Sequence, residues 1–258
     1  MTDGETFKDH FSATAEAYGR YRPAYPAALF ESLAALAPGC ELAWDCGCGN
    51  GQASRGLAAH FAVVHASDPS EQQIAQAVPH PRVTYAVGRA EASGLPDASV
   101  DLILAAQAAH WFDHGAFHAE VRRVARPGGL LALVSYGRLA IEPKIDEILR
   151  RYHDETLGPH WPSERWLVVE GYKDLPFPFP ELEPPALEMA DDWTLEHLIG
   201  YLGTWSALAR YREDRGEDPL PAVSEALAAA WGPPKGSRRV RWPLALRLGR
   251  VGEIAKVS

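Results

Sequence analysis

The sequence predicts an α/β fold in which a mostly parallel sheet is covered by helices on both faces. Between residues 40 and 136, short apolar runs alternate with segments whose apolar residues recur at helical spacing. The apolar runs are almost continuous, which is typical of parallel strands buried on both faces. The chain has 258 residues, 47% apolar and 23% charged, which suits one large domain with an insertion.

The first half of the chain is regular. An alanine-rich stretch over 12–21 looks helical, and Pro26 can occupy the first position of a second helix that ends before Pro38. Ser70 and Gln73 have the spacing of a helix capping box. We expect strands over residues 41–47, 62–68, 83–88, 100–108 and 130–137, and helices over 52–61, 70–77 and 117–125, the last stopped by the RPGG sequence at 126–129.

After Gly137 the pattern becomes less regular. Proline and aromatic residues alternate in one segment, which predicts a packed connection rather than a loose linker. We expect helices over residues 145–157, 163–174, 193–214 and 224–232, the packed connection over 175–185, and a closing strand over 239–251.

The charge balance limits the partners. The formal net charge is −9, and an acidic surface repels nucleic-acid phosphates and anionic membranes, so we expect neither partner. Arg238, Arg239 and Arg241 form a basic cluster that a solvated strand end explains. The stretch MTDGETFKDHF has no basic region followed by an apolar one, so we expect no signal peptide there, and no apolar run approaches the ~20 residues that span a bilayer. We therefore expect a cytoplasmic protein.

The cysteines point to a reducing compartment. There are three, Cys40, Cys46 and Cys48, and they form no disulfide framework. Cys46 and Cys48 have the spacing of half a metal site, but no second cluster of ligands accompanies them. We expect no bound metal, and we interpret both residues as small residues in a tight turn.

The sequence DCGCGNG at residues 45–51 predicts a ligand site. In an open α/β sheet, ligands bind beyond the carboxyl ends of the strands, where this loop lies. Dinucleotide sites require G-x-G-x-x-G. Gly47 and Gly49 fit that pattern, but Gln52 occupies the place of the third glycine. A nicotinamide-dependent oxidoreductase is therefore a weak alternative.

Two acids favour a different cofactor. Asp45 would repel a pyrophosphate but would attract an ammonium group, and S-adenosylmethionine carries an ammonium and no phosphate. Asp68 ends the second strand at about the 20-residue distance expected of a ribose acceptor, although it could instead cap the next helix. Ala90 and Glu91 follow the third strand and suit adenine, unless they belong to an ordinary surface loop.

Taken together, these motifs resemble a known family. The stretches WDCGCGNGQAS, SDPS, GRAEASGLPDASVDLILAAQAAHWFD and RVARPGGLLALVSYG, within residues 7–136, look like the motifs of class I S-adenosylmethionine-dependent methyltransferases. The flanking FSATAEAYGRYRPAYPAALF, GYLGTWSALARY and WPLALRLGR resemble the methyltransferase type 11 group, which includes trans-aconitate methyltransferases. The resemblance implies a Rossmann-like seven-stranded sheet whose last, antiparallel strand occupies residues 239–250.

The same resemblance implies the cofactor residues and the organisation of the chain. Asp45 and Gly47 would lie at the methionine end and Asp68 at the ribose. The implied cofactor-binding residues are Tyr18, Tyr21, Arg22, Asp45, Gly47, Gly49, Asp68, Ala90, Glu91 and Gln107. The implied single domain, 1–258, comprises N-terminal helices that close over the cofactor (1–38), a cofactor-binding core (39–137), a substrate lid insertion (138–205) and a last helix with the closing strand (206–258).

Arg22 would pair with the cofactor carboxylate, or form a surface ion pair, and Gln107 would lie under the cofactor. The acceptor is expected to be a small molecule. A carboxylate is already ionised at neutral pH, so its O-methylation needs no base. His110 could be a base, an electrostatic clamp or a packed residue. Trp111 could wall the substrate pocket or pack beneath the lid.

Arg138 and Arg165 are further candidates, as binders of an acceptor carboxylate. The expected activity is methyl transfer from S-adenosylmethionine to a small-molecule acceptor, with a carboxylate oxygen as a candidate for the methylated atom. We expect the protein to be a monomer or a homodimer. The main alternative is a protein that binds the cofactor without turnover.

Overall fold

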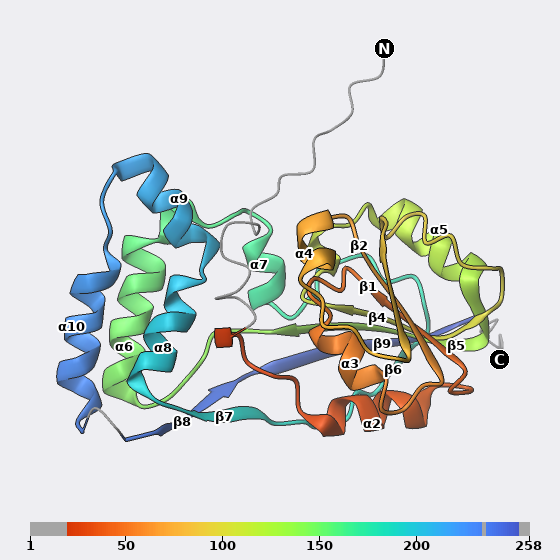
Figure 1. The fold of residues 1–258 in the computed structure, drawn as a ribbon, viewed down its shortest axis with the longest axis horizontal. Helices are drawn as coiled ribbons and strands as arrows, with labels where there is room; N and C mark the ends of the chain where they lie inside the picture. Colours follow the sequence, from red (N-terminus) through yellow and green to blue (C-terminus); the bar gives the residue numbers. More distant parts are fainter. Residues whose placement is uncertain (1–19, 234–235, 253–258) are drawn as a thin grey trace, which may run out of the picture.

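A seven-stranded sheet forms the centre of the protein (Figure 1). The computed structural model describes residues 20–233 and 236–252. The strand order is β3-β2-β1-β4-β5-β9-β6, with β1 to β5 parallel and β9 antiparallel to both β5 and β6. The strands are β1 Leu42–Cys46, β2 Val63–Asp68, β3 Val83–Val87, β4 Val100–Ala106, β5 Ala125–Tyr136, β6 Glu181–Leu182 and β9 Leu244–Val251. The predicted Rossmann-like sheet is confirmed.

Helices cover both faces of the sheet because alternate strand residues point to opposite sides. Trp44 and Cys46 of β1 pack in a cluster with Phe117. Ala43, which precedes Trp44 and points to the opposite face, packs instead with Leu57. The first face is covered by α5 (His114–Val124) and α7 (Arg165–Val169), and the second by α2 (Ala27–Leu36) and α3 (Gln52–Leu57).

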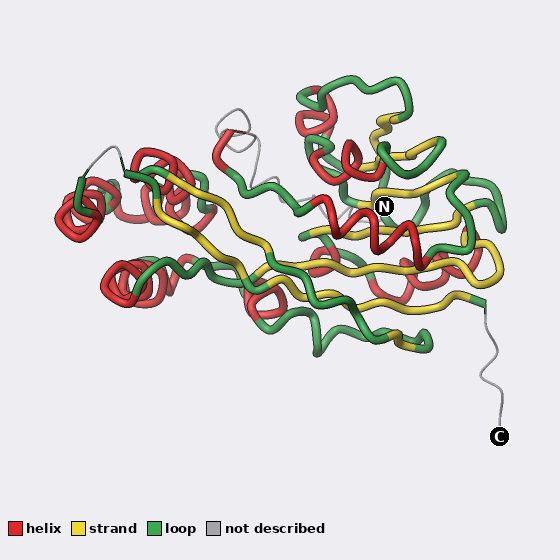
Figure 2. Tube along the Cα trace, turned by 90° about the horizontal axis from the view of Figure 1, so that it is seen from below, coloured by secondary structure: helices red, strands yellow, loops and turns green. Residues whose placement is uncertain are grey.

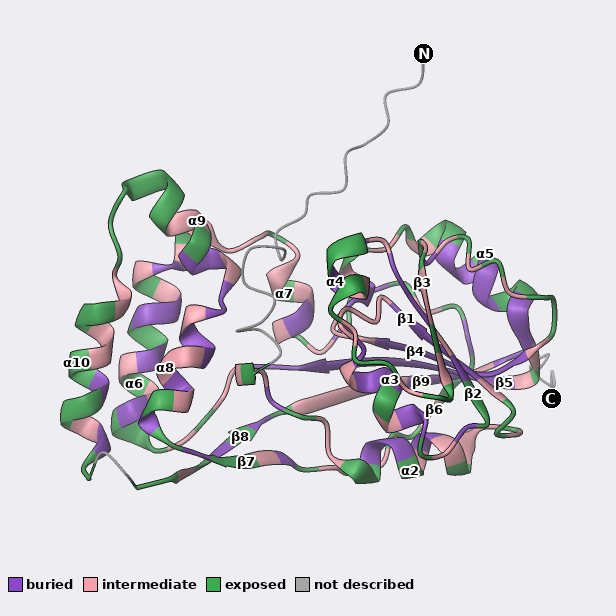
Figure 3. Cartoon of the chain, in the orientation of Figure 1, coloured by how far each residue is buried: buried purple, intermediate pink, exposed green. Residues whose placement is uncertain are grey.

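A separate group of helices, here called the helical lobe, lies beside the sheet (Figure 1). It has a hydrophobic core of its own, which includes Leu149, Trp205 and Trp231. Its inner helix surfaces are buried and its outer surfaces exposed (Figure 3). The lobe contains α6 Pro143–Arg151, η3 Tyr152–Thr156, η4 Gly158–His160, α8 Leu195–Gly203, α9 Ser206–Arg215, α10 Leu220–Trp231 and the antiparallel pair β7 Met189–Trp193 and β8 Arg238–Trp242.

Since Trp231 and Trp242 belong to this core, the lobe extends beyond the expected lid boundary at residue 205. Figure 2 shows the strands running on from the main sheet to the helices of the lobe. Among the described residues, no helix is both long enough and apolar enough to cross a membrane.

The predicted helix over 193–214 is wrong in two respects. Its first residue, Trp193, ends strand β7, and the helical part is divided into α8 and α9. Trp205 interrupts the helix with extended backbone, and its ring packs into the lobe core. Tertiary packing of an aromatic side chain therefore overrides the local helical pattern.

Three other boundaries differ from the predictions. The predicted closing strand is divided at Pro243 into β8 and β9, because proline has no N–H to donate to a ladder. Strand β5 begins at Ala125 and so includes the RPGG sequence at 126–129, whereas the strand was expected to begin at residue 130. The helix expected over 163–174 is only α7, because Gly171 and Tyr172 adopt left-handed backbone with φ of 68° and 62°.

Smaller differences concern helix ends. The helix predicted over 145–157 ends at Arg151 and continues as the π-helical turn η3. The capping prediction is confirmed for one of its two bonds: Ser70 caps the helix α4 (Glu71–Ala75) by accepting the N–H of Gln73 at 3.3 Å, whereas the N–H of Ser70 donates to Asp68.

Asp101 belongs to β4, and its side chain attaches the first residues of β1 to this strand. Its buried carboxylate accepts the backbone N–H groups of Glu41 at 2.9 Å and Leu42 at 3.0 Å, and pairs with Arg126 at 2.9 Å. Without the carboxylate, these donors would lose their acceptor at an edge of the core.

We predict that Asp101→Ala lowers the free energy of unfolding by about 3 kcal/mol, because it leaves backbone donors and a guanidinium unsatisfied. Urea denaturation measures this change. The matched control is Asp97→Asn, which removes an exposed ion pair with Arg123 and should cost less than about 1 kcal/mol. Equal losses in the two variants would contradict the assignment.

Candidate active site

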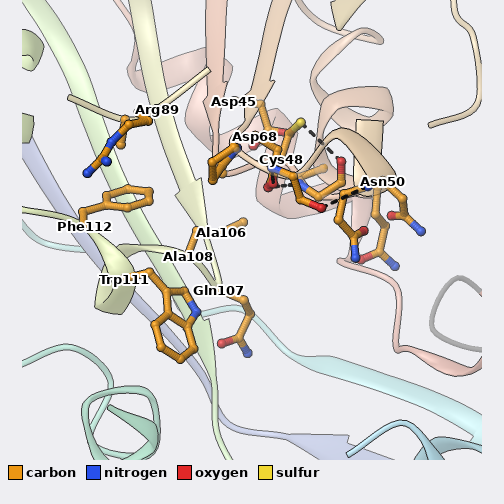
Figure 4. A pocket seen from close by; sticks show the side chains of 18 of the residues that line it. Asp45, Cys48, Asn50, Asp68, Arg89, Ala106, Gln107, Ala108, Trp111 and Phe112 are labelled. Carbon is orange, nitrogen blue, oxygen red and sulfur yellow. Dashed lines mark hydrogen bonds between the residues drawn. The ribbon is translucent and has the colours of Figure 1, made fainter. Parts of the chain in front are cut away.

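A cavity of about 910 Å³ opens at the carboxyl ends of β1, β2 and β4 (Figure 4). It lies where the strand order reverses, between β1 and β4, which is the usual ligand position in open α/β sheets. We call it the first cavity. It is lined by Arg22, Tyr25, Asp45, Gly47, Cys48, Gly49, Asn50, Gln52, Ala53, Asp68, Pro69, Ser70, Gln73, Val87, Gly88, Arg89, Ala90, Glu91, Ala106, Gln107, Ala108, Trp111, Phe112, Tyr136 and Glu164.

The glycine loop has the backbone that its sequence predicts. Gly47, Gly49 and Gly51 have φ of 71°, 55° and 83°, in the left-handed region that favours glycine. A Cβ on Gly47 would lie 2.5 Å from that of Ala108, and one on Gly51 would lie 2.3 Å from the Tyr85 hydroxyl. These glycines therefore allow the loop to pass close to its neighbours while its backbone lines the cavity.

Asp68 joins the loops that follow β1 and β2. Its Oδ2 accepts the N–H of Gly49 at 2.9 Å, and its Oδ1 accepts the N–H of Ser70 at 2.9 Å. The sequence left two roles open for this residue, and the contact with Ser70 places it at the start of α4. A carboxylate has about four acceptor sites, so these bonds are compatible with ribose binding.

Asp45 is a buried carboxylate on the wall of the same cavity. Ser54 donates its hydroxyl to Oδ2 at 2.5 Å. Burial raises the pKa of Asp45 to about 7 despite this bond, and the negative charge of Asp68 acts in the same direction. A cation in the cavity would favour the ionised form, so the site is suited to a positively charged ligand group.

The residues predicted beside adenine lie together near Phe112. Ala90 is buried, and Glu91 accepts the N–H of Asp113 at 2.9 Å and pairs with Arg89 at 3.2 Å. Arg89 and Phe112 lie next to each other at this end of the cavity (Figure 4). The arrangement offers an apolar surface with polar groups at its edge.

Gln107 also lines the cavity, at the end of β4. It has a left-handed backbone with φ of 55°, and its side-chain amide donates to the Tyr136 carbonyl at 3.1 Å. This bond connects the ends of β4 and β5 beneath the cavity.

His110 is held in a neutral state. Its Nδ1 lies 2.9 Å from the Tyr172 hydroxyl. Burial, together with the charge of Arg165, lowers the pKa of His110 to about 3. An imidazole with this pKa is uncharged at neutral pH, which disfavours the roles of cationic clamp and base and favours that of a packed residue. The neighbouring Trp111 lines the cavity and is 40% exposed.

Of the three residues expected to close over the cofactor, one lines the first cavity. Tyr18 lies outside the described residues. Tyr21 is not among the residues that line the cavity: its ring packs on α8 against His197, at a centroid distance of 5.3 Å, and over Gly200, which has no side chain to obstruct it. Arg22 does line the cavity.

Arg138 and Arg165 do not line the first cavity. They line a second cavity of about 320 Å³ in the helical lobe. Arg138 pairs with Asp154 at 2.8 Å, and the guanidinium of Arg165 lies over Trp161 at 5.2 Å. The two candidates are therefore adjacent to the predicted cofactor site without being part of it.

Sequence reasoning missed several lining residues. Tyr136 ends β5, beside β4, and the rule that ligands bind at carboxyl strand ends could have found it. Glu164 and Tyr25 come from distant segments and carried no local signal. Gln52, which breaks the dinucleotide pattern, donates to the Pro23 carbonyl at 2.9 Å and so ties the segment before α2 to the glycine loop.

The cysteines lie in different surroundings. Cys46 is buried in the core beside Trp44, whereas Cys48 lines the first cavity. Over residues 20–233 and 236–252, no group of three or more His, Cys, Asp or Glu side chains could hold a metal ion.

Comparisons with known proteins agree with this fold and site. A family model described as a methyltransferase domain matches residues 44–133. A methyltransferase of Dictyostelium discoideum is 32% identical over 95% of this chain and 95% of its own. An uncharacterised methyltransferase of Mycobacterium tuberculosis is 31% identical over 84% of this chain and 90% of its own.

A solved structure of a type II methyltransferase from Anaeromyxobacter dehalogenans is 54% identical, with a TM-score of 0.84, and the match covers 89% of this chain and 98% of that one. The chain therefore belongs to the class I S-adenosylmethionine-dependent methyltransferases. None of these names specifies a methyl acceptor, so the likeness to trans-aconitate methyltransferases stays a prediction from sequence.

We predict that His110 does not become protonated between pH 5 and 8, because its pKa is lowered to about 3 by burial and by Arg165. Long-range proton–nitrogen NMR of the histidine rings measures this. A His110 signal that shifts near pH 6.5 would contradict the prediction and restore this residue as a candidate base.

Proposed function

We propose that the chain binds S-adenosylmethionine in the first cavity and transfers a methyl group to a carboxylate oxygen of a small acid. The observation that carries the cofactor assignment is the pair Asp45 and Asp68. Both carboxylates line one cavity beside a glycine loop, and one is buried with its pKa raised to about 7. This wall suits a cationic ligand and repels a pyrophosphate.

The donor set fits the cofactor. Asp45 would attract its ammonium group, Asp68 would accept its ribose hydroxyls, and the surface beside Ala90 and Phe112 would receive its adenine. The bound cofactor supplies a methyl group on a sulfonium sulfur, which is an electrophile. The protein's contribution is to hold the acceptor in line and to exclude water.

The acceptor assignment rests on the charges near the cavity. His110 is neutral and has a lowered pKa, which makes it a poor base. Arg22 lines the first cavity, and Arg165 is close enough for its charge to act on His110. An acceptor that arrives ionised needs no base, and a carboxylate is attracted by guanidinium groups. These features favour an acid over a phenol or an amine.

Two alternative functions differ from this proposal: one lacks methyl transfer, and the other uses a different cofactor. A protein that binds the cofactor without catalysis would share every feature of the first cavity, so only methyl transfer to an added acceptor separates it from an enzyme. A nicotinamide-dependent oxidoreductase is disfavoured by Gln52, which stands in the place of the third glycine, and by Asp45.

We predict that S-adenosylhomocysteine binds the purified protein with micromolar affinity and that NAD does not bind. Asp68→Asn should weaken this binding by about 1–3 kcal/mol, because it removes a charged hydrogen-bond acceptor. Calorimetric titration measures both effects. Glu71→Gln is the matched control, since it makes the same charge change on an exposed residue of α4. Failure of S-adenosylhomocysteine to bind would overturn the cofactor assignment.

Binding should also depend on pH through Asp45. At pH 7.5 this carboxyl is mostly ionised, whereas at pH 6 it is mostly protonated, because its pKa is about 7. The ligand ammonium keeps its charge over this range and prefers the ionised form. We therefore expect binding roughly tenfold weaker at pH 6 than at pH 7.5.

Calorimetry at the two pH values measures this ratio. Asp45→Asn should bind more weakly at pH 7.5 and lose most of the pH dependence. If the variant retains the full dependence, another group is responsible for it.

A further inference from the structure

The second cavity adjoins the first through a shared wall. Consecutive residues at the start of α7 divide between them, with Glu164 lining the first cavity and Arg165 the second. Arg22 lines the first cavity, and its guanidinium lies 5.4 Å from the ring centroid of Tyr201, which lines the second. A ligand in the second cavity would therefore lie next to the predicted cofactor site.

Two of the three arginines that line this cavity are compensated by acids. Arg138 pairs with Asp154 at 2.8 Å. Arg150 pairs with Glu147 at 2.8 Å and with Glu155 at 3.2 Å. The positive charges of Arg138 and Arg150 are therefore balanced by the carboxylates beside them.

Arg165 differs from both. Within residues 20–233 and 236–252 it makes no ion pair, and its buried Nε has no hydrogen-bond partner. Its position is also costly for a cation, since burial lowers the pKa of its guanidinium and Arg22 and Arg138 repel it. A half-buried guanidinium whose Nε is shielded from water and that has no anionic partner is unfavourable. Binding one anionic group there would relieve that cost.

The other walls select the rest of the ligand. Leu139, Leu149, Tyr201 and Trp205 give the cavity an apolar and aromatic lining. Its volume of about 320 Å³ has room for about ten non-hydrogen atoms if each takes the ~30 Å³ of a liquid water. A single ring or a short branched chain with a carboxylate is of this size.

The lining also limits the number of anionic groups. Asp146 and Glu147 belong to the same cavity, and Asp146 is held there because it accepts the N–H of Ile141 at 2.7 Å. With one uncompensated cation and the carboxylate of Asp146 in its wall, the cavity should repel a second carboxylate.

We infer that the second cavity binds the body of the methyl acceptor, and that the acceptor is a monocarboxylic acid whose apolar part is about the size of one ring. Arg165 holds the carboxylate at the shared wall, and Leu149, Tyr201 and Trp205 enclose the apolar part. The inference rests on the proposed function for the identity of the ligand as acceptor, but its binding can be measured without turnover.

The test is calorimetric titration of acids into the full chain saturated with S-adenosylhomocysteine. The probes are phenylacetate, cyclohexanecarboxylate and 4-methylvalerate, compared with acetate, neutral phenylacetamide and the dicarboxylate phenylsuccinate. We expect at least one of the first three to bind, and acetate, the amide and the dicarboxylate each to bind at least tenfold more weakly than it.

Two variants locate the binding. Arg165→Gln should weaken binding of the acid at least tenfold while leaving binding of the amide unchanged. Leu149→Trp fills the cavity and should abolish binding of the acid. Arg151→Gln is the matched control, since it removes an exposed arginine of α6 that does not line the cavity. Unchanged affinity for S-adenosylhomocysteine in all three variants shows that the fold is intact.

The outcomes separate this inference from the proposed function. Binding of an acid that depends on Arg165, without formation of a methyl ester from S-adenosylmethionine, supports the cavity assignment and overturns carboxylate methylation. Ester formation that is unaffected by Arg165→Gln and Leu149→Trp supports the proposed function and overturns this inference. Tighter binding of phenylsuccinate, or no binding of any acid, also overturns it.

Discussion

The carboxylate of Asp68 is the interaction on which the site depends. By accepting one N–H from the glycine loop and another from the start of α4, it fixes the loops after β1 and β2 relative to each other. The backbones of Gly47 and Cys48 add to this connection by donating to the carbonyl of Ser67, at 2.8 Å and 3.0 Å. The shape of the first cavity therefore follows from a few hydrogen bonds at the ends of adjacent parallel strands.

This arrangement keeps Asp45 and Asp68 near each other, which is unfavourable in the absence of a cation. Ser54 stabilises the ionised form of Asp45 only in part, and its pKa stays raised. Binding energy for a positively charged ligand is thus stored in the folded protein as like-charge repulsion and desolvation. In the second cavity the charge is of opposite sign, because the half-buried Arg165 is a cation without an ion-pair partner among the described residues.

The sheet and the glycine loop could be predicted because their signals are local. Apolar runs identify strands such as β4, and alternating glycines after an apolar run identify a loop with left-handed backbone. The helical lobe could not be predicted to the same extent. The break at Trp205 and the pairing of β7 with β8 depend on contacts between residues far apart in the chain. For the same reason, no sequence pattern indicated that Glu164 would reach the first cavity.

One connection between the main sheet and the helical lobe lies at Gly137 and Pro243. The backbone of Gly137, just after β5, donates to the carbonyl of Pro243 at 2.9 Å, and Pro243 separates β8 from β9. On one side of this connection lies the sheet with its two packed faces, and on the other a lobe with a core of its own. Substitutions inside the lobe can therefore change the shape of the second cavity without changing the packing of the sheet. A duplicated copy of this protein could acquire a new acceptor by changes confined to the lobe, while the cofactor half keeps its sequence.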